Sequence, residues 1–139
     1  MPDTLLELPD GDITALLPFV DTAVFMNFQP GVDADDVLPR PALTAVFGNK
    51  GPSLPLATWT PGEIGLQHGL GIRAAPWLKD HDVPIPEDWY VVTDNPRRGL
   101  VVRTYSTPVD EVLTWLVQAA TRLCPYAILM PWQAVVRTR

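Results

Sequence analysis

The chain has 139 residues, 47% of them hydrophobic, and a formal net charge of −6. A chain of this length and composition can bury one hydrophobic core, so we expect a single globular domain over residues 1–139. The acidic balance argues against nucleic-acid binding, which needs a basic surface to release counterions from the phosphates.

The charges are distributed unevenly along the chain. Residues 1–50 hold eight acidic residues against two basic ones, whereas the stretch from Arg97 onward holds six arginines against Asp110 and Glu111. This division permits a charge-complementary contact with another protein or with a second copy of the chain. We therefore expect a protein partner or self-association. The alternative is that these charges form an ordinary solvated surface.

Composition also predicts a cytoplasmic protein. Cys124 is the only cysteine and cannot form an internal disulfide, which favours a reducing compartment. The N-terminal segment has Asp3 and Glu7 where a signal peptide would have basic residues. The most apolar run, residues 13–28, is interrupted by Pro18 and is too short to span a bilayer comfortably, so no membrane association is expected. Arginine outnumbers lysine eight to two, which points to a GC-rich bacterial source.

The first 50 residues predict one short helix and two strands. Asp12 precedes the apolar run 13–17, which predicts a short helix with an aspartate cap that ends near Pro18. The runs 22–28 and 43–47 predict buried strands. The acidic stretch 33–36 lacks the glycine and the later carboxylate of a calcium loop, so we expect a solvated turn there.

Residues 63–72 alternate with a period of two, which predicts a strand. One face is apolar and includes His68, which we expect to be a buried structural histidine and not a catalyst. Glycines on the other face would leave a shallow trough for a ligand or another backbone. The alternative is that a helix or ring of the same domain fills the trough. The candidate ligand-binding residues at this strand are Gln67, His68 and Arg73.

The segment from Gly69 to Ala74 matches the G-x-G-x-x-A form of the dinucleotide-binding fingerprint. Pro76 falls at the start of the short helix predicted over 74–80, however, and no series of βαβ units surrounds the motif. The two histidines are thirteen residues apart and the one cysteine lies elsewhere, which is no zinc spacing. We therefore predict no cofactor and no metal site.

Residues 89–93 and 100–105 flank a turn and predict a β-hairpin. Pro96 suits the second position of a type I turn, and Gly99 suits a left-handed position that closes the loop. We expect a regular register, with Trp89 and Val91 on the same face as Leu100 and Val102. The opposite face would then have Tyr90, Val92, Asp94, Val101, Arg103 and Tyr105.

Arg97 and Arg98 at the tip of this hairpin are candidate partner-binding residues. Two adjacent guanidinium groups at an exposed turn can bind carboxylates or phosphates bidentately. The alternative is that both arginines only keep the tip soluble.

Residues 107–123 predict a long helix, with Thr107 as the N-cap and Pro108 at the first position. Trp115 lies off its apolar stripe and is a third partner-binding candidate, because tryptophan is a common interface anchor. Packing within the domain is the favoured alternative for Trp115. A final strand is predicted over 132–137. The apolar stripe consists of Val109, Val112, Leu113, Leu116, Val117, Ala120 and Leu123.

These elements predict an α+β fold: a mainly antiparallel, curved sheet of about five to seven strands with the helix 107–123 packed on one face. Because no catalytic motif is present, we expect a protein that acts by binding, as a regulator, adaptor or neutralising partner. The alternative is a small-molecule-binding protein or enzyme with a pocket over the strand 63–73. A deep cavity over the glycines would favour that alternative.

Overall fold

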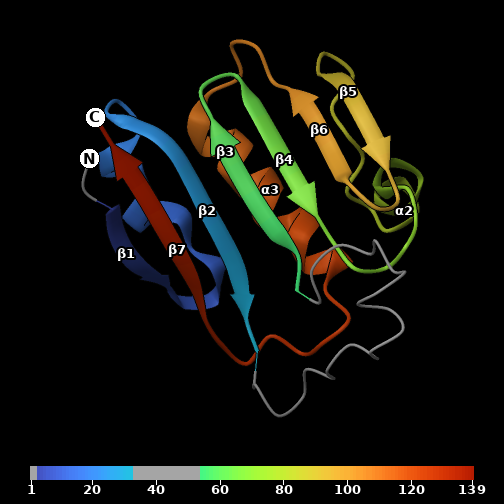
Figure 1. Ribbon diagram of the computed structural model, residues 1–139, viewed down its shortest axis with the longest axis horizontal. Helices are drawn as coiled ribbons and strands as arrows, with labels where there is room; N and C mark the ends of the chain where they lie inside the picture. Colours follow the sequence, from blue (N-terminus) through green and yellow to red (C-terminus); the bar gives the residue numbers. More distant parts are fainter. Residues whose placement is uncertain (1–2, 33–53) are drawn as a thin grey trace.

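A computed structural model describes residues 3–32 and 54–139 of the chain. Its strands form one open, seven-stranded antiparallel sheet in the order β1-β7-β2-β3-β4-β6-β5. Figure 1 views the sheet from the face over which no helix of the described residues lies, with α3 behind the strands. The predicted α+β class, with a mainly antiparallel sheet and a long helix on one face, is therefore confirmed.

The N-terminal part contains two strands and two short 3-10 helices. The predicted cap is confirmed, because Oδ1 of Asp12 accepts a hydrogen bond from the backbone N–H of Thr14 at 3.0 Å. The strand predicted over 43–47 and the acidic turn predicted over 33–36 lie outside the described residues. The elements before residue 33 are β1 (Asp3–Leu8), η1 (Pro9–Gly11), η2 (Ile13–Phe19) and β2 (Ala23–Gly31).

The remaining elements alternate between hairpins and helices. The last strand, β7, does not lie at the edge of the sheet but between β1 and β2. No helix among the described residues is long and apolar enough to cross a membrane. The elements after residue 53 are β3 (Leu56–Thr60), β4 (Glu63–Gln67), α2 (Ala74–Asp80), β5 (Tyr90–Asn95), β6 (Gly99–Arg103), α3 (Val109–Leu123) and β7 (Met130–Thr138).

The helix α3 packs on the sheet with a wider face than the stripe predicts. Its buried residues include Trp115 and Ala119 in addition to most of the predicted stripe. The helix also begins at Val109, so the prediction that Thr107 caps it is wrong. The Thr107 hydroxyl instead accepts a hydrogen bond from the indole N–H of Trp89 at 2.8 Å. No side-chain hydrogen bond caps the start of α3.

The strand β4 ends at Gln67, five residues before the predicted end at Ile72. At that point Nδ1 of His68 accepts the backbone N–H of Leu70 at 3.3 Å, and Gly71 has a φ of +71°, which turns the chain toward α2. Only Gly65 of the three glycines remains within the strand. The predicted trough of three glycines along one strand face therefore does not form.

The hairpin of β5 and β6 has a β-bulge that the predicted register lacks. Val91 pairs with Val102 but Thr93 pairs with Val101, so Val92 is the extra residue. Beyond a bulge the side chains change faces. Asp94 therefore lies on the helix-covered face of the sheet and not, as predicted, on the opposite one.

The predicted left-handed glycine at the hairpin turn is confirmed. Gly99 has a φ of +94°, and a Cβ atom there would collide with the carbonyl oxygen of Leu66. The absence of a side chain lets the end of the hairpin pack directly against β4.

Candidate functional site

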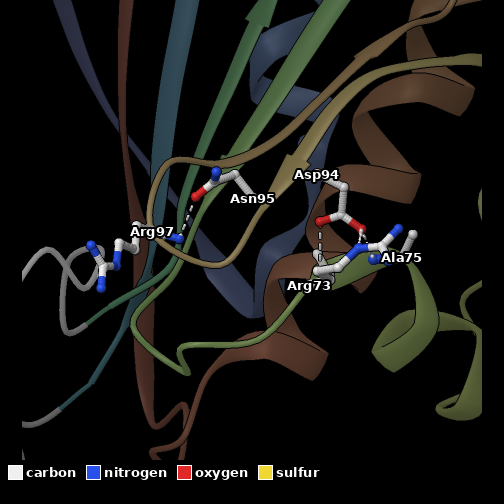
Figure 2. Close-up of polar contacts among 6 residues, drawn as sticks. Arg73, Ala75, Asp94, Asn95 and Arg97 are labelled. Atoms are coloured by element: carbon white, nitrogen blue, oxygen red, sulfur yellow. Dashed lines mark hydrogen bonds and ion pairs between the residues drawn. The ribbon is translucent and has the colours of Figure 1, made fainter.

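The bulge brings Asp94 to the start of α2, where it has a structural role. Its side chain, only 4% exposed, accepts the backbone N–H groups of Ala74 at 2.8 Å and of Ala75 at 2.9 Å (Figure 2). Nε of Arg73 lies 3.9 Å from Oδ2 of Asp94 and the rest of the arginine extends into solvent. Asp94 thus joins the end of β5 to α2.

His68 is buried beside this anchor. Its Nδ1 accepts a hydrogen bond, so its proton is on Nε2, which has no partner among the described residues. Burial lowers the pKa of His68, and the negative charge of Asp94 opposes that shift in part. A buried histidine with a lowered pKa is neutral at pH 7.

The three ligand-binding candidates therefore lie near one another without forming a shared pocket. Gln67 is exposed at the end of β4, His68 is buried, and Arg73 is largely exposed. None of the three lines the cavities described below.

Both tip arginines, Arg97 and Arg98, are exposed. Oδ1 of Asn95 accepts their backbone N–H groups at 2.8 and 3.1 Å, which fixes the turn. In Figure 2 the guanidinium of Arg97 points away from Arg73 and Asp94. Within residues 3–32 and 54–139, neither tip arginine forms an ion pair. The tip is therefore a separate basic feature of the surface.

Trp115 packs within the domain, which is the alternative that the sequence favours. Its side chain is 8% exposed, and its indole N–H donates to the carbonyl oxygen of Pro84 at 3.0 Å. The ring meets that of Trp89 edge to face, with 5.2 Å between the centroids. Trp115 does not project from the surface, but the two tryptophans together form part of the wall of a cavity.

This cavity, which we call the tryptophan cavity, has a volume of about 410 Å³. The indole N–H groups of Trp89 and Trp115 are both already hydrogen-bonded inside the domain, so the rings present carbon atoms. Three carboxylates and no basic group lie among its lining residues. The lining consists of Pro86, Asp88, Trp89, Thr107, Asp110, Glu111, Thr114, Trp115 and Gln118.

Two of these carboxylates also have a structural reason to be there. Asp110 and Glu111 lie in the first turn of α3, where the helix dipole favours negative charge. Asp88 precedes the β5 strand and belongs to no helix. The combination of aromatic walls and a carboxylate rim suits a positively charged group.

A second cavity, of about 440 Å³, adjoins the first and shares Pro86 and Trp89 with it. It reaches Val91 of β5, which is an edge strand. Three consecutive apolar residues of this strand are 57%, 37% and 44% exposed. We call the two cavities together with Tyr90, Val91 and Val92 the β5-edge surface.

A third cavity, of about 340 Å³, lies beside η1 and the start of β7. Leu129 and Met130, both exposed, line it, and Asp10 is the only charged residue among its lining residues. This cavity therefore has fewer charged groups that could select a ligand than the β5-edge surface has.

The described residues contain no group of three His, Cys, Asp or Glu side chains that could hold a metal ion. Sequence reasoning did not find the tryptophan cavity, because Trp89 and Trp115 come together only through packing.

Comparison of the chain with protein-family models, curated proteins and solved structures gave no match.

Proposed function

We propose that this protein acts by binding at the β5-edge surface, to another protein or to a second copy of the chain, as a regulator, adaptor or neutralising partner without catalysis of its own. The observation that supports this most directly is the pair of adjoining cavities that share Trp89 beside an edge strand with exposed apolar residues. Protein interfaces combine such an apolar, aromatic centre with a polar rim.

Neither His68 nor Cys124 lines the two cavities of this surface. His68 is buried with a lowered pKa. Burial also raises the pKa of the Cys124 thiol, which donates to the carbonyl oxygen of Tyr126 at 3.5 Å. A raised pKa makes the thiol a weak nucleophile at pH 7. This supports binding over chemistry, and the single cysteine supports a cytoplasmic location.

The alternative of a small-molecule pocket over residues 63–73 has less support. Of its three glycines only Gly65 lies in β4, and the cavities described above are lined by other residues. A Cβ atom on Gly65 would have only ordinary contacts with the two strands that flank β4, at 3.7 Å from the carbonyl oxygen of Leu100 and 3.9 Å from Cβ of Thr58.

Two charge-introducing variants test the proposal. Val92→Glu places a carboxylate on the exposed part of β5 within the β5-edge surface, at the unpaired bulge residue. Leu129→Glu makes the same change at an exposed apolar residue beside the third cavity. The tagged protein is used to capture partners from a lysate of the source organism, followed by mass spectrometry for proteins and small molecules.

We expect the wild type and Leu129→Glu to recover the same protein in constant ratio and Val92→Glu to lose it. Recovery of the same partner by all three would show that binding takes place elsewhere. A small molecule that co-purifies in stoichiometric amount, without a protein, would favour the alternative.

A further inference from the structure

The carboxylates of the tryptophan cavity have no cationic partner within the described part of the chain. The ion pairs there are Arg73–Asp94, Arg103–Glu63 and Arg137–Asp3, and none involves a residue of the cavity. An aromatic wall next to carboxylates favours a guanidinium group, which stacks on a ring and forms paired hydrogen bonds. The cavity is thus complementary to an arginine side chain.

The chain itself presents such a group at the hairpin tip. Arg97 and Arg98 are adjacent and exposed, and Asn95 holds their backbone in a fixed turn. A fixed turn loses little conformational entropy when it binds. The guanidinium of Arg97 points away from Asp94 (Figure 2), and within the described residues neither tip arginine forms an ion pair.

The tip cannot reach the cavity of its own molecule. Trp89 immediately precedes β5, whereas Arg97 follows its last residue, so the six-residue strand separates them by about 20 Å. Contact between the two surfaces therefore requires a second copy. We propose that the chain associates head to tail, with the Arg97–Arg98 tip of one copy in the tryptophan cavity of the next. This inference rests on the proposed function, because it names the occupant of the same β5-edge surface.

The contact joins two different patches, so it is heterologous and can continue beyond a dimer. Each copy has a net charge of −6, so two copies repel each other at long range. At about 0.15 M salt, charges more than ~8 Å apart are largely screened, whereas pairs in contact are screened less. We therefore expect association near physiological salt and its weakening at about 1 M salt.

Sedimentation velocity over a range of protein concentrations tests the inference with two variants. The tip variant Arg97→Ala with Arg98→Ala lacks the guanidinium groups, and the cavity variant Asp88→Asn with Glu111→Gln lacks two carboxylates. We expect the wild type to associate with increasing concentration and each variant alone to remain a monomer. An equimolar mixture should form a dimer and nothing larger, because each variant supplies the surface that the other lacks.

Two matched controls remove the same charges elsewhere. Arg122→Ala with Arg139→Ala deletes two exposed arginines, and Glu7→Gln with Asp21→Asn neutralises two exposed acids. Both should associate as the wild type does. Melting temperatures of all the variants establish that each one is folded.

A wild type that stays monomeric at every concentration would overturn the inference, as would a tip variant that associates normally. So would two monomeric variants whose mixture fails to dimerise. A monomeric wild type that still captures a partner, and loses it through Val92→Glu, would overturn self-association and leave the proposed function standing.

Discussion

Asp94 is the side chain on which the junction of β5 and α2 depends. It is nearly fully buried and accepts two backbone N–H groups that nothing else in the first turn of α2 would satisfy. We expect Asp94→Ala to lower the free energy of unfolding by about 1–3 kcal/mol, measured by urea denaturation. Asp80→Ala, at the exposed end of the same helix, should change it by less than about 0.5 kcal/mol. Equal effects would show that Asp94 does not anchor α2.

His68 should make the stability of the protein depend on pH. Its pKa is lowered in the folded state, so the unfolded chain binds this proton more tightly. The free energy of unfolding should therefore decrease as the pH falls below the ordinary histidine value of about 6.5, until the folded-state pKa is passed. Asp3 and Asp12 also have lowered pKa values, but an aspartate loses its contribution only in more acidic solution, near 3.8 and below.

His68→Leu removes this titration. Urea denaturation at about pH 7.5 and about pH 5.5 should give a smaller loss of stability for the variant than for the wild type. His81 is present in both proteins, so its effect cancels in the comparison. The same loss of stability in both would show that burial does not shift the pKa of His68.

At the scale of single elements, α3 supplies the main helical contribution to the core. Leu116 is fully buried on its sheet-facing side, whereas Gln118 is exposed. We expect Leu116→Ala to destabilise the protein by about 2–5 kcal/mol in denaturant melts, because it leaves a cavity in the core. Gln118→Ala should stay within about 0.5 kcal/mol of the wild type. A large effect of Gln118→Ala would show that the side of α3 assigned to the sheet is the wrong one.

Elements with a strong local signal could be predicted from the sequence. The helix α2 has the predicted bounds, Asp12 caps η2, and Gly99 closes the hairpin, because each depends on residues close together in the chain. The strands β1 and β3 were not predicted. The partner of β1 is β7, at the other end of the sequence, so local residues do not specify it. The strand β3 pairs with β2 and with β4, which follows it after two residues.

The site was harder to predict because contacts between distant residues create it. The bulge at Val92 turns Asp94 toward N–H groups that lie twenty and nineteen residues away. Trp89 and Trp115 form one cavity wall only after α3 packs against the segment that precedes β5. Arg97 and Arg98, in contrast, were predicted to be exposed, because the turn chemistry that exposes them is local.

At the scale of the whole molecule, β7, the last of the described strands in chain order, lies between β1 and β2 in the sheet. β7 pairs with β1 on one side and β2 on the other, and Trp132 packs against Phe28 with 6.1 Å between the ring centroids. Without β7, neither β1 nor the free side of β2 has a strand to pair with among the described residues. The sheet therefore depends on residues at both ends of the chain.

Two deletions test this dependence. Removing residues 130–139 takes away the buried side chains of Trp132, Ala134 and Val136 and leaves two strands without their neighbour. We expect this protein to lose its cooperative unfolding transition in urea, followed by far-ultraviolet circular dichroism and tryptophan fluorescence. Removing residues 1–7 deletes the edge strand β1 except for its last residue, the buried Leu8. That protein should retain a cooperative transition at a lower urea concentration, because β7 still pairs with β2. Cooperative unfolding of the protein without residues 130–139 would show that the other strands form a stable core without β7.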